Sequence, residues 1–108
     1  MIVKSGQDGY VEVIDGIRLK TLVHGARTHL IRVELRKGAV IPEHQHPQEQ
    51  TGYLIEGKLR FFMGEEEAMV SPGDCWTFAS DEPHGAEALE DTVVIEVFSP
   101  LREDYLKL

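Results

Sequence analysis

The chain has 108 residues, a length that suits one domain with a sizeable hydrophobic core, so we expect residues 1–108 to form a single domain. Eleven basic and nineteen acidic residues give a net charge of −8 without any basic cluster, which argues against a surface for nucleic acid or anionic membranes. No stretch has the apolar length of a signal peptide or a membrane span, and the expected location is therefore the cytoplasm.

Short segments with strand character follow one another along the chain and are separated by turn residues. Asp15-Gly16 marks a hairpin turn between the runs 10–14 and 17–23. Residues 29–35 alternate apolar and charged side chains, the pattern of a strand with one buried face. Further strand-like runs occupy 51–56, 58–63, 67–70, 75–79, 85–89 and 92–98. Eight to ten short strands predict an all-β antiparallel sandwich or barrel, followed by a tail or helical turn at 101–108.

Several polar side chains are assigned to structure rather than to chemistry. The run Glu65–Glu67 predicts a solvated hairpin tip. Cys75 is the only cysteine, which excludes an intramolecular disulfide, and its place in an apolar run predicts a buried, inert thiol. His24 and His29 lie near turns, and we expect both on the surface.

The stretch from Gly38 to Gly57 holds the first group of candidate ligands. His44 and His46 are two residues apart, and Gln50 has the same parity, so a continuous strand would direct all three side chains to one side. Glu49 has the opposite parity and is the less favoured ligand. The alternative is an exposed strand that carries two surface histidines.

His84 completes the candidate metal site. It lies between Pro83 and Gly85 at a junction of loop and strand, where functional groups often lie. Three imidazoles and one amide oxygen suit a divalent transition metal such as nickel, iron, manganese, cobalt or zinc. Without a carboxylate ligand the site keeps its full positive charge, which favours an anionic substrate or a bound hydroxide.

These residues carry a resemblance to a known family. The pattern Gly38-x5-His44-x-His46-x3-Gln50-x6-Gly57 resembles the first motif of the cupin superfamily. Gly64, Pro72-Gly73-Asp74 and Pro83-His84-Gly85 resemble the second. The resemblance implies a double-stranded β-helix, a jelly-roll-like antiparallel barrel with the metal at its mouth. Gln50 stands at the usual glutamate position, so chemistry that depends on that glutamate is not expected.

The C-terminal part carries a narrower resemblance. Residues 88–92 and 97–106 are similar to the small pectin-degradation cupins, which open the ring of unsaturated uronates released by pectate or alginate lyases. The resemblance implies that Phe98 and Arg102 contact the substrate. Glu96 stands where that family has an aspartate, which retains an acid/base group on a longer side chain. Small cupins of this kind are usually homodimers.

The last strand can also be interpreted without the family. Val94, Glu96 and Phe98 share one side of 92–98, and a carboxylate in an apolar strand is costly to bury unless it is paired or functional. One interpretation is an edge strand with Glu96 in solvent. The other directs Glu96 into the barrel mouth, where its pKa would rise and it could transfer protons.

Three further side chains have two interpretations each. Arg102 suits the bidentate binding of a substrate carboxylate, or a surface ion pair with Glu103 or Asp104. Tyr53 and Phe61 line a substrate cavity, or simply pack the barrel.

The function that these residues favour is conversion of an unsaturated uronate to its linear keto form. The metal and Arg102 would orient the anionic sugar acid, and Glu96 would move a proton. Two alternatives stay open: a three-histidine iron-dependent dioxygenase of a small molecule, and a non-enzymatic small-molecule binding barrel.

Overall fold

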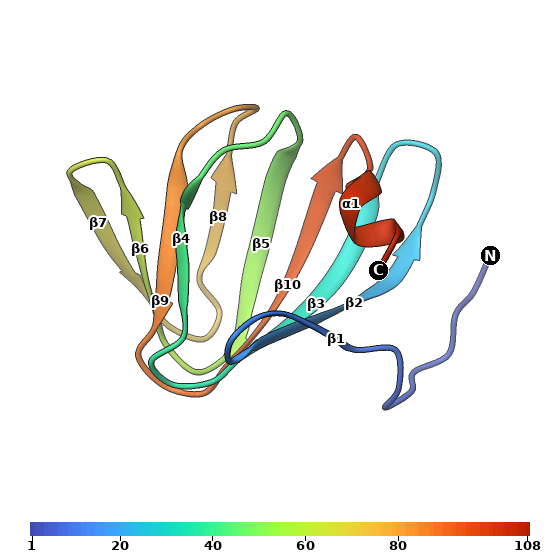
Figure 1. The fold of residues 1–108 in the computed structure, drawn as a ribbon, viewed down its shortest axis with the longest axis horizontal. Helices are drawn as coiled ribbons and strands as arrows, with labels where there is room; N and C mark the ends of the chain where they lie inside the picture. Colours follow the sequence, from blue (N-terminus) through green and yellow to red (C-terminus); the bar gives the residue numbers. More distant parts are fainter.

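The computed structural model describes residues 1–108, which form ten strands and one short helix (Figure 1). In chain order these elements are β1 (Val11–Ile14), β2 (Ile17–His24), β3 (His29–Leu35), β4 (Val40–His44), β5 (Glu49–Glu56), β6 (Leu59–Met63), β7 (Glu66–Val70), β8 (Cys75–Phe78), β9 (His84–Ala88), β10 (Thr92–Ser99) and α1 (Glu103–Leu106).

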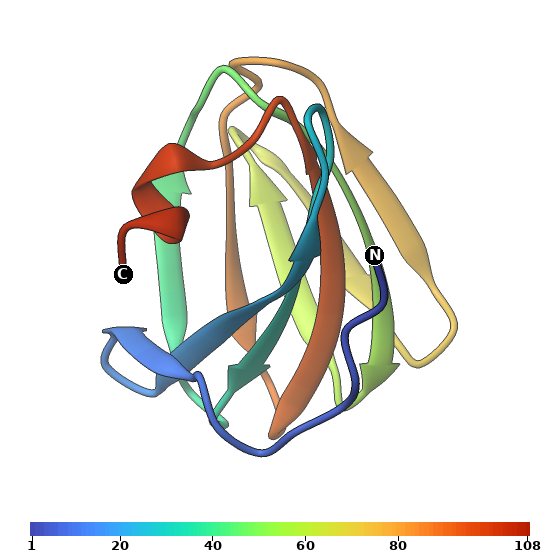
Figure 2. The ribbon, with the colours of Figure 1, turned by 90° about the vertical axis from the view of Figure 1, so that its right-hand side faces the viewer.

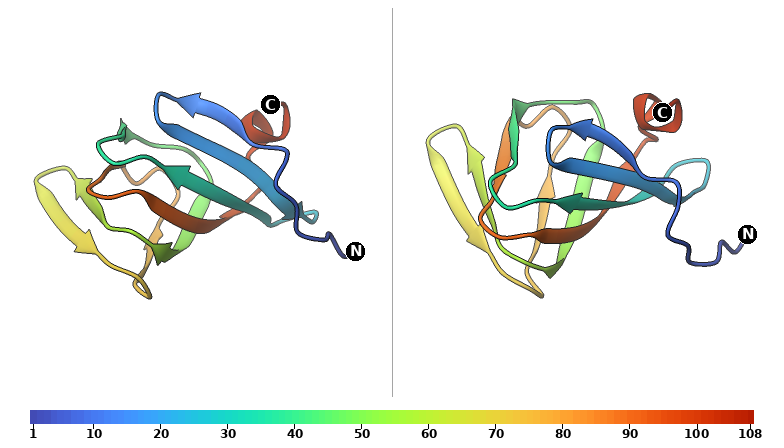
Figure 3. Two further views of the ribbon diagram at one scale, coloured as in Figure 1. Left: turned by 90° about the horizontal axis from the view of Figure 1, so that it is seen from below. Right: turned by 60° about the horizontal axis from the view of Figure 1, so that its bottom comes forward.

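The strands form two antiparallel sheets. One has six strands in the order β1-β2-β3-β10-β5-β8, and the other has four in the order β4-β9-β6-β7. Viewed from below, the β1–β2 hairpin lies far from the β6–β7 hairpin, with the other strands between them (Figure 3). The all-β antiparallel fold expected from the sequence is confirmed, as is the helical turn near the C-terminus.

Alternating side chains explain how the sheets enclose one core. In β3, Ile31, Val33 and Leu35 are buried, whereas the intervening side chains of Arg32 and Glu34 are partly exposed. β10 lies between β3 and β5 and pairs with both along its length. The interpretation of this segment as an edge strand with Glu96 in solvent is therefore wrong.

Two expectations about single residues are also wrong. His29 is fully buried, because it shares the inward parity of Ile31 in β3. Cys75 is exposed, because the alternation of β8 directs the neighbouring Trp76 and Phe78 towards the core. His24, by contrast, is exposed as expected.

One end of the molecule gathers the segments that matter for function. The β4–β5 connection, the β8–β9 connection and the chain that leaves β10 all lie at the upper end in Figures 1 and 2. α1 follows directly and lies beside this end (Figure 2). The only helix has four residues, far too few to span a bilayer.

Candidate metal centre

Three histidines come together at this upper end. His44 ends β4, His46 lies in the loop that follows, and His84 begins β9 and pairs directly with His44. One ring nitrogen from each lies within 4.8 Å of the others. His46 and His84 are buried and His44 is half-buried. The grouping expected for these three residues is therefore present.

Backbone carbonyls fix the tautomers of all three rings. The Nδ1 atoms of His44, His46 and His84 lie 2.9, 3.0 and 2.7 Å from the carbonyl oxygens of Pro42, Gln48 and Glu82, respectively. A carbonyl only accepts, so each Nδ1 carries the proton and donates it. Each Nε2 then keeps a lone pair, and a metal-binding histidine is commonly oriented in this way.

Gln50 belongs to the same group but comes from the other sheet. Its Oε1 lies 3.0 Å from the Nε2 of His46. With the proton of His46 on Nδ1, both atoms of this contact are acceptors, and a cation between them would remove the conflict. The continuous strand that would align these side chains by parity does not form, because residues 45–48 form a loop that passes from β4 to β5.

The environment of His84 favours the neutral form of its ring. Burial lowers the pKa of His84, and the same cause lowers the pKa of His46. The Nε2 of His84 is buried without a hydrogen-bond partner. Phe78 stacks on the ring, with centroids 4.3 Å apart and planes at 8°. An oriented neutral imidazole with an unused buried lone pair fits a metal ligand, and this donor set suits a divalent transition metal.

A cavity of about 70 Å³ extends from these residues into the interior. His44, Gln50 and His84 are among the residues that line it, and most of its remaining lining is apolar. Glu96, Phe98 and Arg102 also line it, so the structure brings the metal-site and substrate-site candidates together. The volume holds roughly two water molecules, enough for the reacting end of a ligand.

Glu96 is the carboxylate of this cavity. It accepts hydrogen bonds from the side-chain amide of Gln50 and from the indole N–H of Trp76, the latter at 3.2 Å. Burial raises the pKa of Glu96 to about 7, although both hydrogen bonds favour the charged form. A carboxyl group that titrates near neutral pH can both accept and donate a proton there.

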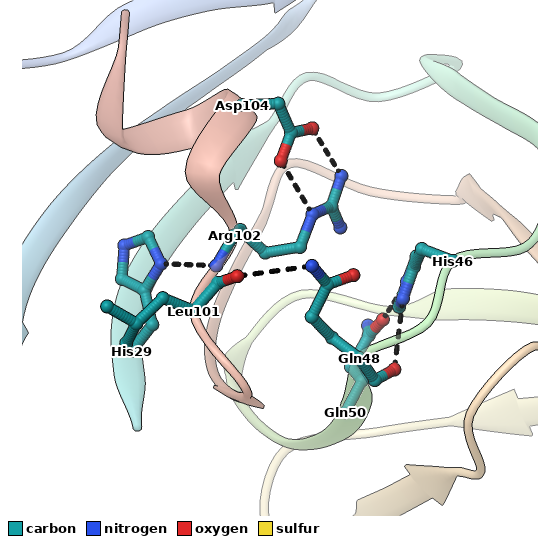
Figure 4. Close-up of polar contacts among 7 residues, drawn as sticks. All are labelled: His29, His46, Gln48, Gln50, Leu101, Arg102 and Asp104. Atoms are coloured by element: carbon teal, nitrogen blue, oxygen red, sulfur yellow. Dashed lines mark hydrogen bonds and ion pairs between the residues drawn. The ribbon is translucent and has the colours of Figure 1, made fainter. Parts of the chain in front are cut away.

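Arg102 both forms an ion pair and lines the cavity. Its Nε and Nη2 atoms donate to the two carboxylate oxygens of Asp104 at 3.0 and 2.8 Å, which confirms an ion pair (Figure 4). Yet Arg102 is only 8% exposed, and its guanidinium carbon lies 4.0 Å from the ring centroid of Tyr105. The pair with Asp104 therefore holds a guanidinium that also lines the cavity.

The remaining candidates separate clearly. Phe61 is buried and lines the cavity, whereas Tyr53 is 45% exposed and does not. The sequence did not reveal the hydrogen bond that the indole of Trp76 donates to Glu96. Nor did it reveal the role of Gln48, whose carbonyl orients His46. The position of Gln48 between two candidate ligands was the available signal.

The comparisons with known proteins agree with this geometry. Residues 31–99 match the family model described as a cupin domain. The chain is 31% identical to the pectin degradation protein KdgF of Dickeya dadantii over 97 residues, 88% of each chain. It is similar to the structure of KdgF from Halomonas sp., with 36% identity, a TM-score of 0.83 and coverage of 88% of this chain and 90% of that chain. An RmlC-like cupin from Shewanella frigidimarina shares the fold, with 24% identity, a TM-score of 0.89 and coverage of 95% and 94%. The chain belongs to the cupin family.

Proposed function

We propose that this protein opens the ring of an unsaturated uronate from pectin or alginate breakdown and yields its linear keto form. The observation that carries the proposal is the single cavity that joins Glu96, Phe98 and Arg102 to the histidine cluster. The similarity to pectin degradation proteins over most of the chain supports it.

Residues of the cavity would hold the metal and the substrate. His44, His46 and His84 would ligate a divalent metal through Nε2, with Gln50 Oε1 as a fourth ligand. When bound, that metal would supply positive charge that stabilises an oxygen anion of the substrate. The Nη1 atom of Arg102 makes no bond to Asp104, and we assign it to the substrate carboxylate.

Glu96 is the group that we assign to proton transfer. Opening the ring breaks the bond between the anomeric carbon and the ring oxygen. The anomeric hydroxyl loses its proton and the ring oxygen gains one, which leaves an aldehyde and an enol. The enol becomes a ketone when its adjacent carbon takes up a proton and its hydroxyl gives one up. A carboxyl group with a pKa near 7 suits both directions of transfer.

The decisive assay follows the ultraviolet absorbance of the unsaturated monouronate. Metal-loaded protein should remove this absorbance faster than buffer does, and no acceleration would sink the proposal. Oxygen consumption with candidate small molecules would instead favour the three-histidine iron dioxygenase, for which the same three ligands would serve. Binding of the uronate without turnover would favour the non-enzymatic barrel.

A cytoplasmic homodimer completes the proposal. The dimer is supported by the resemblance to small cupins and by the exposed apolar side chains of Tyr53 and Ile55 on β5. Light scattering after size exclusion should give twice the mass of one chain, and a single-chain mass would contradict the dimer.

A further inference from the structure

One peptide group beside the candidate site is held at both of its ends by side chains that the proposed chemistry does not use. The peptide joins Leu101 to Arg102. Its N–H donates to Nδ1 of His29 at 3.2 Å, and its carbonyl oxygen accepts from Nε2 of Gln48 at 3.1 Å (Figure 4). His29 begins β3 and Gln48 lies in the β4–β5 loop, so two segments far apart in the sequence form hydrogen bonds with the same peptide group.

The contact of His29 has only one possible direction. A backbone N–H always donates, so Nδ1 of His29 must be the acceptor and Nε2 must carry the proton. That Nε2 lies 2.8 Å from the hydroxyl of Thr21, which can accept it. His29 is fully buried, and burial lowers its pKa, which keeps the ring neutral. This tautomer is the reverse of the one assigned to the three candidate ligands.

Gln48 connects the β4–β5 loop, which carries His46, to the same peptide. Its backbone carbonyl accepts from Nδ1 of His46, while its side chain reaches Leu101. The orientation of a candidate ligand and the position of the C-terminal segment therefore depend on one residue. The half-buried side chain of Gln48 has no other hydrogen bond.

Beyond this peptide, the side chain of Arg102 is fixed as well. Asp104 binds it through two hydrogen bonds, and the rings of Phe98 and Tyr105 lie 5.0 and 4.0 Å from its guanidinium carbon. These contacts fix the guanidinium relative to α1 and β10. The two hydrogen bonds to the Leu101–Arg102 peptide, from His29 and Gln48, then fix Arg102 relative to β3 and to the β4–β5 loop.

We propose that His29 and Gln48 are positioning residues for Arg102. They clamp the Leu101–Arg102 peptide so that the guanidinium faces the cavity before a ligand arrives, which saves the cost of ordering it on binding. The inference rests on the proposed function, in which Arg102 binds the substrate carboxylate. Because such binding acts on the bound substrate and on the transition state alike, loss of the clamp raises KM and leaves kcat nearly unchanged.

The first test compares His29→Leu with His29→Asn in metal-loaded protein. Leucine removes the acceptor, whereas the asparagine oxygen can take the place of Nδ1. We expect a rise of roughly tenfold in KM for the unsaturated monouronate in His29→Leu and its reversal in His29→Asn. His24→Gln is the matched control, because His24 is exposed and forms no bond to the C-terminal segment.

Gln48→Glu provides an independent variant should His29→Leu fail to fold. It keeps the shape of Gln48 but replaces the donor to Leu101 with an oxygen that repels the carbonyl. Gln45→Glu adds the same charge in the same loop on an exposed side chain without a hydrogen bond, and so it is the control. Metal content, measured in parallel, should stay equal in all variants.

A second measurement tests, without any substrate, whether His29 and Gln48 hold the Leu101–Arg102 peptide in place. Amide hydrogen exchange of residues 101–108 should be faster in His29→Leu and Gln48→Glu and unchanged in His29→Asn, His24→Gln and Gln45→Glu. If the wild type does not act on the uronate, the proposed function fails and this exchange pattern still decides the clamp. Equal exchange in wild type, His29→Leu and Gln48→Glu would overturn the proposal, as would equal exchange in the leucine and asparagine variants.

Discussion

The side-chain amide of Gln50 donates a hydrogen bond to the carboxylate of Glu96 and directs its oxygen towards His46. One planar group thus connects the candidate metal centre to the only carboxylate that lines the cavity. A glutamate at this position would bring two carboxylates into contact. The glutamine is therefore the residue type that allows Glu96 to lie next to the ligands.

Gln50→Glu tests this relationship. The new carboxylate would strengthen metal binding through its charge, but it would repel Glu96 and could no longer donate to it. We expect equal or higher metal affinity together with a loss of ring-opening rate of at least about tenfold. Calorimetric metal titration and the absorbance assay on the same preparation measure both. Wild-type activity in this variant would show that the amide bond to Glu96 has no role.

His84→Ala removes a buried candidate ligand and leaves His44 and His46 in place. Removal of a single ligand greatly weakens metal binding, so the purified variant should contain much less metal than the wild type. Elemental analysis of protein purified without chelators provides the measurement. His24→Ala, at an exposed histidine, should keep the metal. If metal content survives both His84→Ala and His44→Ala, the ligand set is wrong.

The fold was largely predictable because local patterns determine it. Alternation in 29–35 and the turn at Asp15-Gly16 correspond directly to β3 and to the β1–β2 hairpin. The three histidines were also identified correctly as a group. The parity argument for Gln50 required one continuous strand, whereas in the structure the convergence comes from a loop that joins two sheets.

The residues that were missed depend on contacts between distant segments. Nothing near His29 in the sequence shows that Arg102 will reach its ring, since 73 residues separate them. The bond from Trp76 to Glu96 likewise needs the pairing of β5 with both β8 and β10. The outward position of Tyr53 follows from the parity of β5 relative to the buried Leu54, which the sequence alone left open.

Gly52→Ala should disturb Glu96 through Trp76, since Gly52 lies opposite both residues in the sheet. A Cβ at Gly52 would lie 2.4 Å from the indole of Trp76, so the indole would have to move and lose its bond to Glu96. We expect a loss of roughly 1–3 kcal/mol in the free energy of unfolding, with a lower ring-opening rate. Denaturant unfolding and the absorbance assay provide the readouts. Gly25→Ala, where the new Cβ meets only Thr28 at 4.0 Å, should change neither.

The titration of Glu96 should affect stability in metal-free protein. Its pKa rises from 4.5 to about 7 on folding, so the folded state holds more protons than the unfolded chain between these values. The contribution of Glu96 to the free energy of unfolding therefore falls as pH rises through this window, by roughly 3 kcal/mol at most. Glu96→Gln removes the titrating carboxyl group and with it this dependence of the free energy of unfolding on pH. The difference between wild type and variant, measured in chelator from pH 4 to 8, isolates it from the histidines.

Equal stability differences at both ends of that pH range would contradict a raised pKa. The buried histidines act in the opposite direction, because the lowered pKa values of His46 and His84 make stability rise with pH below about 6.5. These contributions are common to wild type and variant and cancel in the difference.

The most direct test of the account measures metal content and ring-opening rate together in wild type, His84→Ala and Glu96→Gln. The account predicts that metal-loaded wild type accelerates the loss of uronate absorbance over buffer. It predicts that His84→Ala loses both metal and rate, and that Glu96→Gln keeps the metal but loses at least about a hundredfold in rate. A metal-loaded wild type no faster than buffer, or a Glu96→Gln variant as fast as the wild type, would contradict it.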